Sequence, residues 1–139
     1  MFDKIDHIGI AVRSIEAHIP LYRDVFGMEF LGEEEVAEQR VRVAFFKIGE
    51  SLIELLEPTS DDSPIAKHIE KYGEGIHHLA LGCEDIVAAR EAVAARGVRL
   101  LSDAPRDGAH GKLISFMHPK DTGRVLTELT QRKPDAEEH

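Results

Sequence analysis

The chain has 139 residues, of which 42% are hydrophobic and 31% are charged, as in one soluble globular domain. A single cysteine excludes a disulfide framework, and the formal net charge of −9 argues against a nucleic-acid partner. No apolar run reaches the roughly 18 residues that cross a membrane, and no signal-peptide pattern opens the chain, so we expect a cytoplasmic protein without a membrane partner.

The first half of the chain predicts a strand, a helix and three further strands. Residues 4–12 alternate as a strand does, and Ser14 and Gly27 are typical of a helix start and stop. Pro20 lies past the first turn of this helix, where it removes a hydrogen bond, so we expect a kink or a late start. The three strands that follow are expected at residues 28–36, 40–48 and 51–57.

The second half repeats this order after a connecting helix. Ser63 followed by Pro64 predicts the start of a linker helix over about 63–73. Asp85 predicts the N-cap of a second long helix, and the charged tail from Arg132 is expected to fray. The remaining strands are expected at residues 76–83, 98–102, 112–117 and 125–130, with a loop at 104–111. The chain therefore reads as an α+β domain of two βαβββ modules, about 4–58 and 75–131, pairing as two small sheets or one curved sheet.

A histidine followed by a glutamate occurs once in each half of the chain. His7 and His78 open the same short strand pattern and lie 71 residues apart. Glu54 and Glu128 each lie in a later, largely apolar strand and are 74 residues apart. The histidine and the glutamate therefore recur after nearly the same number of residues, which indicates an internal duplication.

This set of residue types predicts a metal site. Small residues share a strand face with each histidine and leave open volume in front of it. A carboxylate inside an apolar strand is costly unless it is paired or holds a cation. Two imidazoles and two carboxylates suit a divalent first-row metal such as Co, Mn, Ni, Fe or Zn. The predicted ligands of this one ion are His7, Glu54, His78 and Glu128, with two positions open for substrate or water.

His77 is the competing ligand to His78. The repeat aligns His77 with Asp6 and therefore places it off the inner face of its strand. We expect His78 to be the ligand and His77 to face a helix or to support the site from behind.

The chain resembles the vicinal oxygen chelate superfamily of glyoxalases, bleomycin resistance proteins and dioxygenases, and within it the methylmalonyl-CoA epimerases, over nearly its whole length. The resemblance is carried by the segments 5–11, 55–59, 73–80, 116–120 and 125–129. It implies duplicated βαβββ modules forming a curved mixed sheet around a metal-binding cavity. It also implies a divalent metal ion, an acyl-CoA substrate and a homodimer.

The chemistry implied by the resemblance is interconversion of (R)- and (S)-methylmalonyl-CoA through an enolate at C2. A base on one face of the carbon and an acid on the other invert the centre. Glu128 is the best candidate for one of them. Some family members carry a further Glu on the strand before the hairpin, but Val43 is at that position here and cannot move a proton. Glu54, or a water held by the metal, is the remaining candidate for the second base.

Four polar residues could contact the substrate carboxylate or the CoA phosphates, although they could equally be plain surface residues. They are Lys112, Ser115, His118 and Lys120. Gln39 precedes a predicted strand and could hydrogen-bond the substrate. Lysine and histidine side chains are cationic donors suited to such anions.

Three alternative functions remain open on the sequence. A lactoylglutathione lyase of the glyoxalase I kind uses the same four ligand types and also moves a proton, although the segment around His118 argues against it. A metal-free binding or drug-sequestering module on the same fold is the second. An extradiol dioxygenase is the third, and it would need the fourth metal position free for O₂ and substrate.

Overall fold

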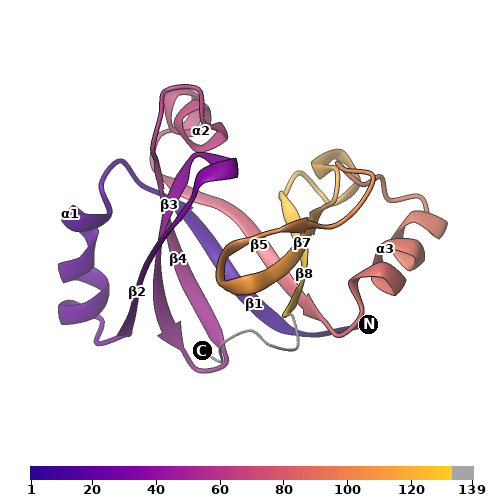
Figure 1. Cartoon of the computed structure of the whole chain (residues 1–139), viewed down its shortest axis with the longest axis horizontal. Helices are drawn as coiled ribbons and strands as arrows, with labels where there is room; N and C mark the ends of the chain where they lie inside the picture. The colour runs from indigo at the N-terminus through magenta and orange to yellow at the C-terminus, as the bar shows by residue number, and fades with distance from the viewer. Residues whose placement is uncertain (133–139) are drawn as a thin grey trace. The chain divides into compact units, whose positions relative to one another are not determined.

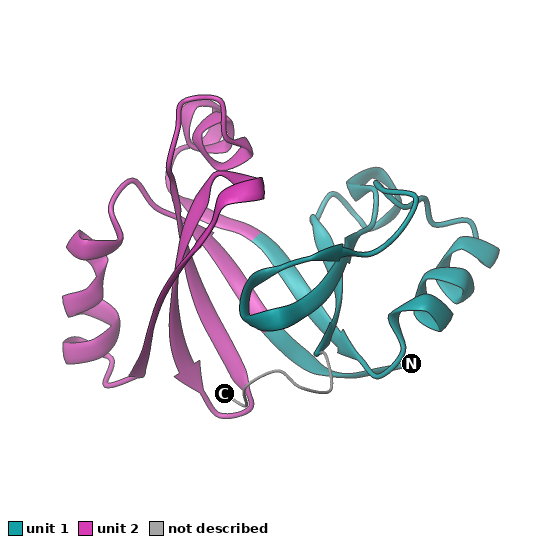
Figure 2. Ribbon diagram, in the orientation of Figure 1, with its two compact units in different colours: residues 1–6, 78–138 teal, residues 7–77, 139 magenta. Residues whose placement is uncertain are grey.

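The computed structural model describes residues 1–132, so most of the predicted charged tail lies outside the described residues. The chain forms two compact units (Figure 2). Of the described residues, 7–77 form the N-terminal unit, and 1–6 together with 78–132 form the C-terminal unit. Two strands, β1 (Phe2–Ala11) and β5 (Gly75–Cys83), contribute residues to both units. The N-terminal unit holds residues 7–58 of the first predicted module and the C-terminal unit holds residues 78–131 of the second, while residues 4–6 and 75–77 belong to the opposite units.

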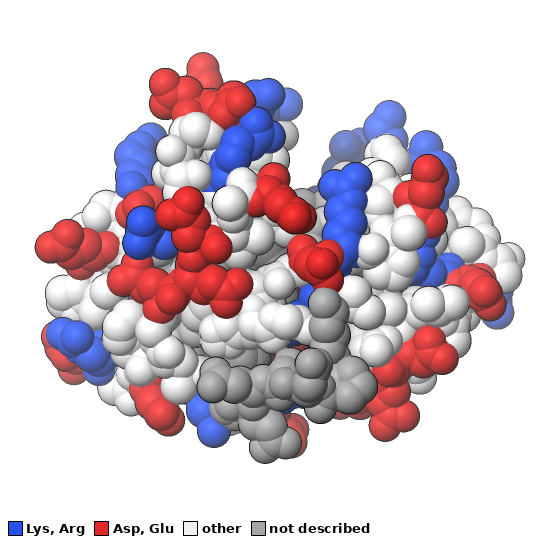
Figure 3. Space-filling view, viewed as in Figure 1, with Lys and Arg blue, Asp and Glu red and all other residues white. Residues whose placement is uncertain are grey.

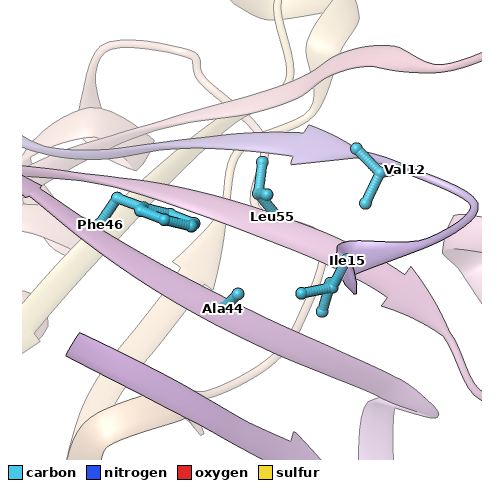
Figure 4. Packing of buried hydrophobic residues seen from close by; sticks show 5 residues of the cluster. All are labelled: Val12, Ile15, Ala44, Phe46 and Leu55. Carbon is cyan, nitrogen blue, oxygen red and sulfur yellow. The ribbon is translucent and has the colours of Figure 1, made fainter. Parts of the chain in front are cut away.

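The N-terminal unit is a mixed sheet with a helix on one face (Figure 1). Its strands follow the order β2-β3-β4-β1, in which β4 runs parallel to β1 and antiparallel to β3. The strands are β2 (Glu29–Val36), β3 (Val41–Ile48), β4 (Ser51–Pro58) and the second half of β1. Helix α1 (Ile15–Ile19) packs on the sheet through a buried apolar cluster (Figure 4). That cluster contains Val12, Ile15, Ala44, Phe46 and Leu55.

The helices of this unit begin and bend where the sequence predicts. The Ser14 hydroxyl accepts a hydrogen bond from the Ala17 backbone N–H at 3.2 Å and caps α1. From Pro20 the winding changes to a π-helical segment (Pro20–Val25), because proline cannot donate the hydrogen bond that would continue the α-helix. Helix α2 (Pro64–Tyr72) is capped in the same way by Ser63, whose hydroxyl accepts from the Ala66 N–H at 3.0 Å.

The C-terminal unit repeats this plan. Its strands follow the order β5-β8-β7-β6, with β5 parallel to β8 and β8 antiparallel to β7. The later strands are β6 (Arg106–Asp107), β7 (Lys112–Phe116) and β8 (Thr127–Arg132). Helix α3 (Ile86–Ala95), capped by Asp85, covers one face. The apolar cluster under it contains Cys83, Ile86, Ala89, Met117 and Leu129.

The strand predicted at residues 98–102 is wrong. This segment makes one isolated bridge, between Leu100 and Met117, and two backbone hydrogen bonds. The Leu101 N–H donates to Phe116, the last residue of β7, and Arg99 accepts from the His118 N–H. The backbone N–H of Arg99 donates to the Asp121 carboxylate, so it is not available to a ladder. Pro105, a few residues on, has no N–H to extend the pairing. The short strand β6 lies instead within the predicted loop 104–111.

Strand β8 begins two residues later than predicted. The Val125 carbonyl accepts hydrogen bonds from the hydroxyls of Thr122 and Thr127, at 2.7 and 2.8 Å, and so is used within its own turn. Strand β7 likewise ends at Phe116, one residue early.

In residues 1–132 no helix combines the length and the apolar character that spanning a membrane requires.

Candidate metal centre and active site

In the N-terminal unit, His7 and Glu54 lie on the sheet face opposite α1. The β1–β4 register pairs His7 with Leu52 and Gly9 with Glu54, so both side chains alternate away from Leu55, which belongs to the cluster under α1. His7 and Glu54 are 3% and 5% exposed, and the distance from His7 Nδ1 to Glu54 Oε2 is 3.3 Å. The unit therefore buries one imidazole beside one carboxylate.

In the C-terminal unit, His78 and Glu128 form the equivalent pair. Ala80 is the register partner of Glu128, so both share the face opposite α3. His78 Nε2 lies 3.9 Å from Glu128 Oε2, and both residues are buried. The Phe116 ring meets the His78 ring edge to face with centroids 5.5 Å apart and covers the pair with apolar surface.

The donor set of each pair fits a divalent first-row ion. Two donor atoms that bind one ion at about 2.1 Å and at right angles are about 3.0 Å apart. The separation of 3.3 Å at His7–Glu54 is close to that value, and the 3.9 Å at His78–Glu128 is longer, though still less than twice the metal–ligand distance. A carboxylate buried among apolar strand residues also gains most from a cation. Each unit thus offers one nitrogen and one carboxylate ligand.

His77 faces α2, as predicted from the repeat. Its ring meets the His68 ring of α2 edge to face, with centroids 4.8 Å apart. Burial, with a further contribution from His68, lowers the pKa of His77 to about 4. His77 is therefore a neutral packing residue at neutral pH.

The predicted substrate residues of the C-terminal unit have different surroundings. Lys112 is 2% exposed and its Nζ donates to Asp6 Oδ2 at 2.7 Å, a buried ion pair that the sequence reasoning missed. Ser115 is the register partner of Leu129, so it lies on the face covered by α3, where it accepts a hydrogen bond from Arg90. The strand register therefore brings Lys112, but not Ser115, to the face of Glu128.

The other three predicted substrate residues lie in turns. His118 caps the 3₁₀ turn Pro119–Asp121 by accepting a hydrogen bond from the Lys120 backbone N–H at 3.2 Å. The Lys120 side chain is exposed to solvent. Gln39 ends the 3₁₀ turn Ala37–Gln39 of the N-terminal unit and is half-buried.

Comparison with known proteins places this arrangement in a family. The model of the Glyoxalase/Bleomycin resistance protein/Dioxygenase superfamily matches residues 6–116. The ethylmalonyl-CoA/methylmalonyl-CoA epimerase of Cereibacter sphaeroides is 41% identical, over 94% of this chain and 99% of that protein. The chain belongs to the methylmalonyl-CoA epimerase family.

Solved structures agree with the family assignment. The Streptomyces coelicolor methylmalonyl-CoA epimerase, in complex with 2-nitronate-propionyl-CoA, is 42% identical with a TM-score of 0.93, and 99% of each chain is covered. The rival family is more distant. An Arabidopsis thaliana lactoylglutathione lyase is 25% identical, and the match covers 45% of that protein. The duplicated mixed-sheet fold predicted from the sequence is therefore confirmed as that of the epimerase family.

Proposed function

We propose that this protein interconverts the (R)- and (S)-epimers of methylmalonyl-CoA by removing and returning the proton at C2. The observation that carries the proposal is the identity of about two residues in five with a methylmalonyl-CoA epimerase over nearly the full length of both chains. The buried His–Glu pair in each unit supports it, because an enolate needs a nearby positive charge in a site that excludes water.

We further propose that both pairs ligate one divalent ion. The proposal rests on the duplication and on the equal placement of each glutamate relative to its histidine. Bound there, the ion would stabilise the negative charge that develops on the substrate oxygens when C2 loses its proton. Which first-row metal is native depends on availability as well as on ligand type.

Glu128 is the proposed acid–base group for one face of C2. The proton at C2 is acidified by two flanking carbonyl groups, so a carboxylate can accept it. The Glu128 side chain is buried, and Phe116 is its register partner on β7. This apolar surrounding shields an enolate from protonation by bulk water.

The residues that bind the CoA group and the oligomeric state are further parts of this proposal. Lys120 is exposed and His118 adjoins it, so these two could bind CoA phosphates, and Gln39 could hydrogen-bond the substrate. Lys112 would serve the substrate carboxylate only by sharing its ammonium group with Asp6. We also propose that the protein is a homodimer in the cytoplasm. Light scattering at working concentration measures the oligomeric state.

Deuterium incorporation at C2 tests the proposed function. The metal-loaded protein is incubated in heavy water with methylmalonyl-CoA, and separately with the methylglyoxal–glutathione adduct. We expect rapid deuterium incorporation and inversion with the first and no turnover of the second. Turnover of the adduct without C2 exchange would assign the protein to the lyases instead.

A further inference from the structure

We infer that Arg106, on the outermost strand of the C-terminal sheet, binds the diphosphate of the CoA substrate. The inference rests on the proposed function, because a CoA thioester is what brings phosphate groups to this site. It concerns the carrier part of the substrate and leaves the chemistry at C2 to the residues already described. His118 and Lys120 stay candidates for the 3′-phosphate of CoA.

The strand register places Arg106 on the face of the C-terminal sheet that carries Glu128. Arg106 on β6 is the direct partner of Ile114 on β7, and Ile114 is the direct partner of Thr130 on β8. Directly opposite residues of neighbouring strands share a face. Since Thr130 lies two residues after Glu128 on β8, the side chains of Arg106 and Glu128 emerge from the same face.

The second residue of β6 points to the other face. Asp107 is the register partner of Leu113, and Leu113 packs against the apolar cluster under α3. Neighbouring residues of a strand alternate between the two faces, so Asp107 lies on the α3 side of the sheet and Arg106 does not. Of the two residues of this strand, Arg106 is therefore the one that faces the site.

The Arg106 guanidinium is exposed, and no acidic side chain among residues 1–132 pairs with it. Other arginines of this unit are already engaged. Arg90 donates to the Ser102 carbonyl at 2.9 Å, and Arg99 forms an ion pair with Asp121 at 2.9 Å. A guanidinium that has no protein partner can bind an anionic ligand, and its planar fork matches two oxygens of a phosphate group.

The segment that carries Arg106 is held against the neighbouring strand. The Gly108 N–H donates to the Lys112 carbonyl at 2.9 Å and closes the connection between β6 and β7. A Cβ at Gly108 would lie 2.9 Å from Ile114 Cγ2, so the absence of a side chain lets the backbone approach this closely. Because the backbone around Arg106 is ordered before a ligand binds, less entropy is lost on binding.

The separation of Arg106 from Glu128 fits the length of the pantetheine arm of CoA. Two strand spacings of about 4.8 Å and two residues at about 3.4 Å place their Cα atoms about 12 Å apart. The arm between the thioester sulfur and the diphosphate is about as long as four residues of extended chain, or about 14 Å. A substrate whose C2 lies at Glu128 therefore brings its diphosphate within reach of the Arg106 side chain.

The charge of the chain makes such a local cation necessary. The formal net charge is −9, which disfavours a ligand with several negative charges over most of the surface. In Figure 3, Lys and Arg side chains project from the upper part of the C-terminal unit, and acidic side chains gather over the strands of the N-terminal unit. An unpaired arginine on the site face of the C-terminal unit supplies attraction where the phosphates would lie.

The test compares Arg106→Gln with Arg96→Gln, which removes an exposed arginine from the end of α3 on the other side of the same sheet. The metal-loaded proteins are assayed with methylmalonyl-CoA and with methylmalonyl-pantetheine, which lacks the phosphates. We expect Arg106→Gln to raise KM for methylmalonyl-CoA by about tenfold, the scale of one charged hydrogen bond, without a change in kcat. KM for the pantetheine thioester should stay the same, and Arg96→Gln should match the wild type with both substrates.

Three outcomes of the kinetics overturn the inference. An unchanged KM of Arg106→Gln for methylmalonyl-CoA removes the role. An equal rise in KM for the pantetheine thioester places the effect away from the phosphates. An equal rise in Arg96→Gln shows a general effect of lost positive charge.

Calorimetry with CoA alone separates this inference from the proposed function. We expect CoA to bind the wild type with a dissociation constant about tenfold lower than that of Arg106→Gln. Equal dissociation constants for the two proteins contradict the inference. A wild type that shows the expected difference in CoA binding but exchanges neither epimer would support the role of Arg106 and refute the proposed function.

Discussion

His7 and His78 occupy the same position relative to a glutamate on the neighbouring parallel strand. The residue two places after His7, Gly9, is the register partner of Glu54, and the residue two places after His78, Ala80, is the register partner of Glu128. The duplication therefore extends from residue type to strand register. A small residue, Gly9 or Ala80, is therefore the strand partner of each carboxylate.

The buried Asp6–Lys112 pair should be costly to break from one side. Because Lys112 is 2% exposed, replacing Asp6 by Asn removes a negative charge that lies beside a buried ammonium group, and we expect a loss of about 3–5 kcal/mol in the free energy of unfolding. Urea denaturation measures it. The double variant Asp6→Asn, Lys112→Met should recover part of the loss, whereas additive losses in the two single variants would contradict a coupled pair.

Asp121 should make the protein sensitive to strong acid. Hydrogen bonds from the Arg99 side chain and backbone lower the pKa of the Asp121 carboxyl to about 2. A carboxyl whose pKa is lower in the folded state contributes stability above its unfolded pKa of about 3.8, and that contribution is lost as the pH falls from there to about 2. The stability difference between wild type and Asp121→Asn should therefore shrink over that interval. A difference that does not change with pH would refute this account.

Phe46 should contribute strongly to the stability of the N-terminal unit. Its ring is fully buried under α1 and meets the rings of Tyr22 and Phe30, so Phe46→Ala removes a large apolar group and leaves a cavity. We expect a loss of about 3–5 kcal/mol. Phe26, which is 55% exposed, is the matched control, and Phe26→Ala should cost less than about 1 kcal/mol. Similar melting temperatures of the two variants would contradict the expected contribution of Phe46 to the core of this unit.

Local signals in the sequence predicted the helix boundaries well. Ser14, Ser63 and Asp85 each cap the helix that they were expected to begin, because a side-chain oxygen before a helix satisfies an N–H group that has no other partner. The change to π-helical winding at Pro20, where a kink or a late start was expected, follows from the missing N–H of proline. These features depend on a few neighbouring residues and so can be read from the chain alone.

Features that depend on distant partners were predicted less well. The segment 98–102 has the composition of a strand, but the Arg99 N–H bonds to Asp121, 22 residues later. Lys112 was one of the residues that could contact the substrate, which stays a prediction, but its ion pair with Asp6, 106 residues away, was not foreseen. The side of β7 on which Ser115 lies depends on its register with β8.

Metal stoichiometry tests the central claim most directly. Three proteins are compared: the wild type, His7→Ala and His78→Ala. Each is stripped of metal with a chelator and reloaded with a single first-row metal, and the bound metal per chain is then measured. Because one ion is proposed to use both pairs, we expect one ion per wild-type chain and an affinity lowered by at least about 100-fold in either variant. Two ions per wild-type chain, with one retained after either substitution, would contradict the account.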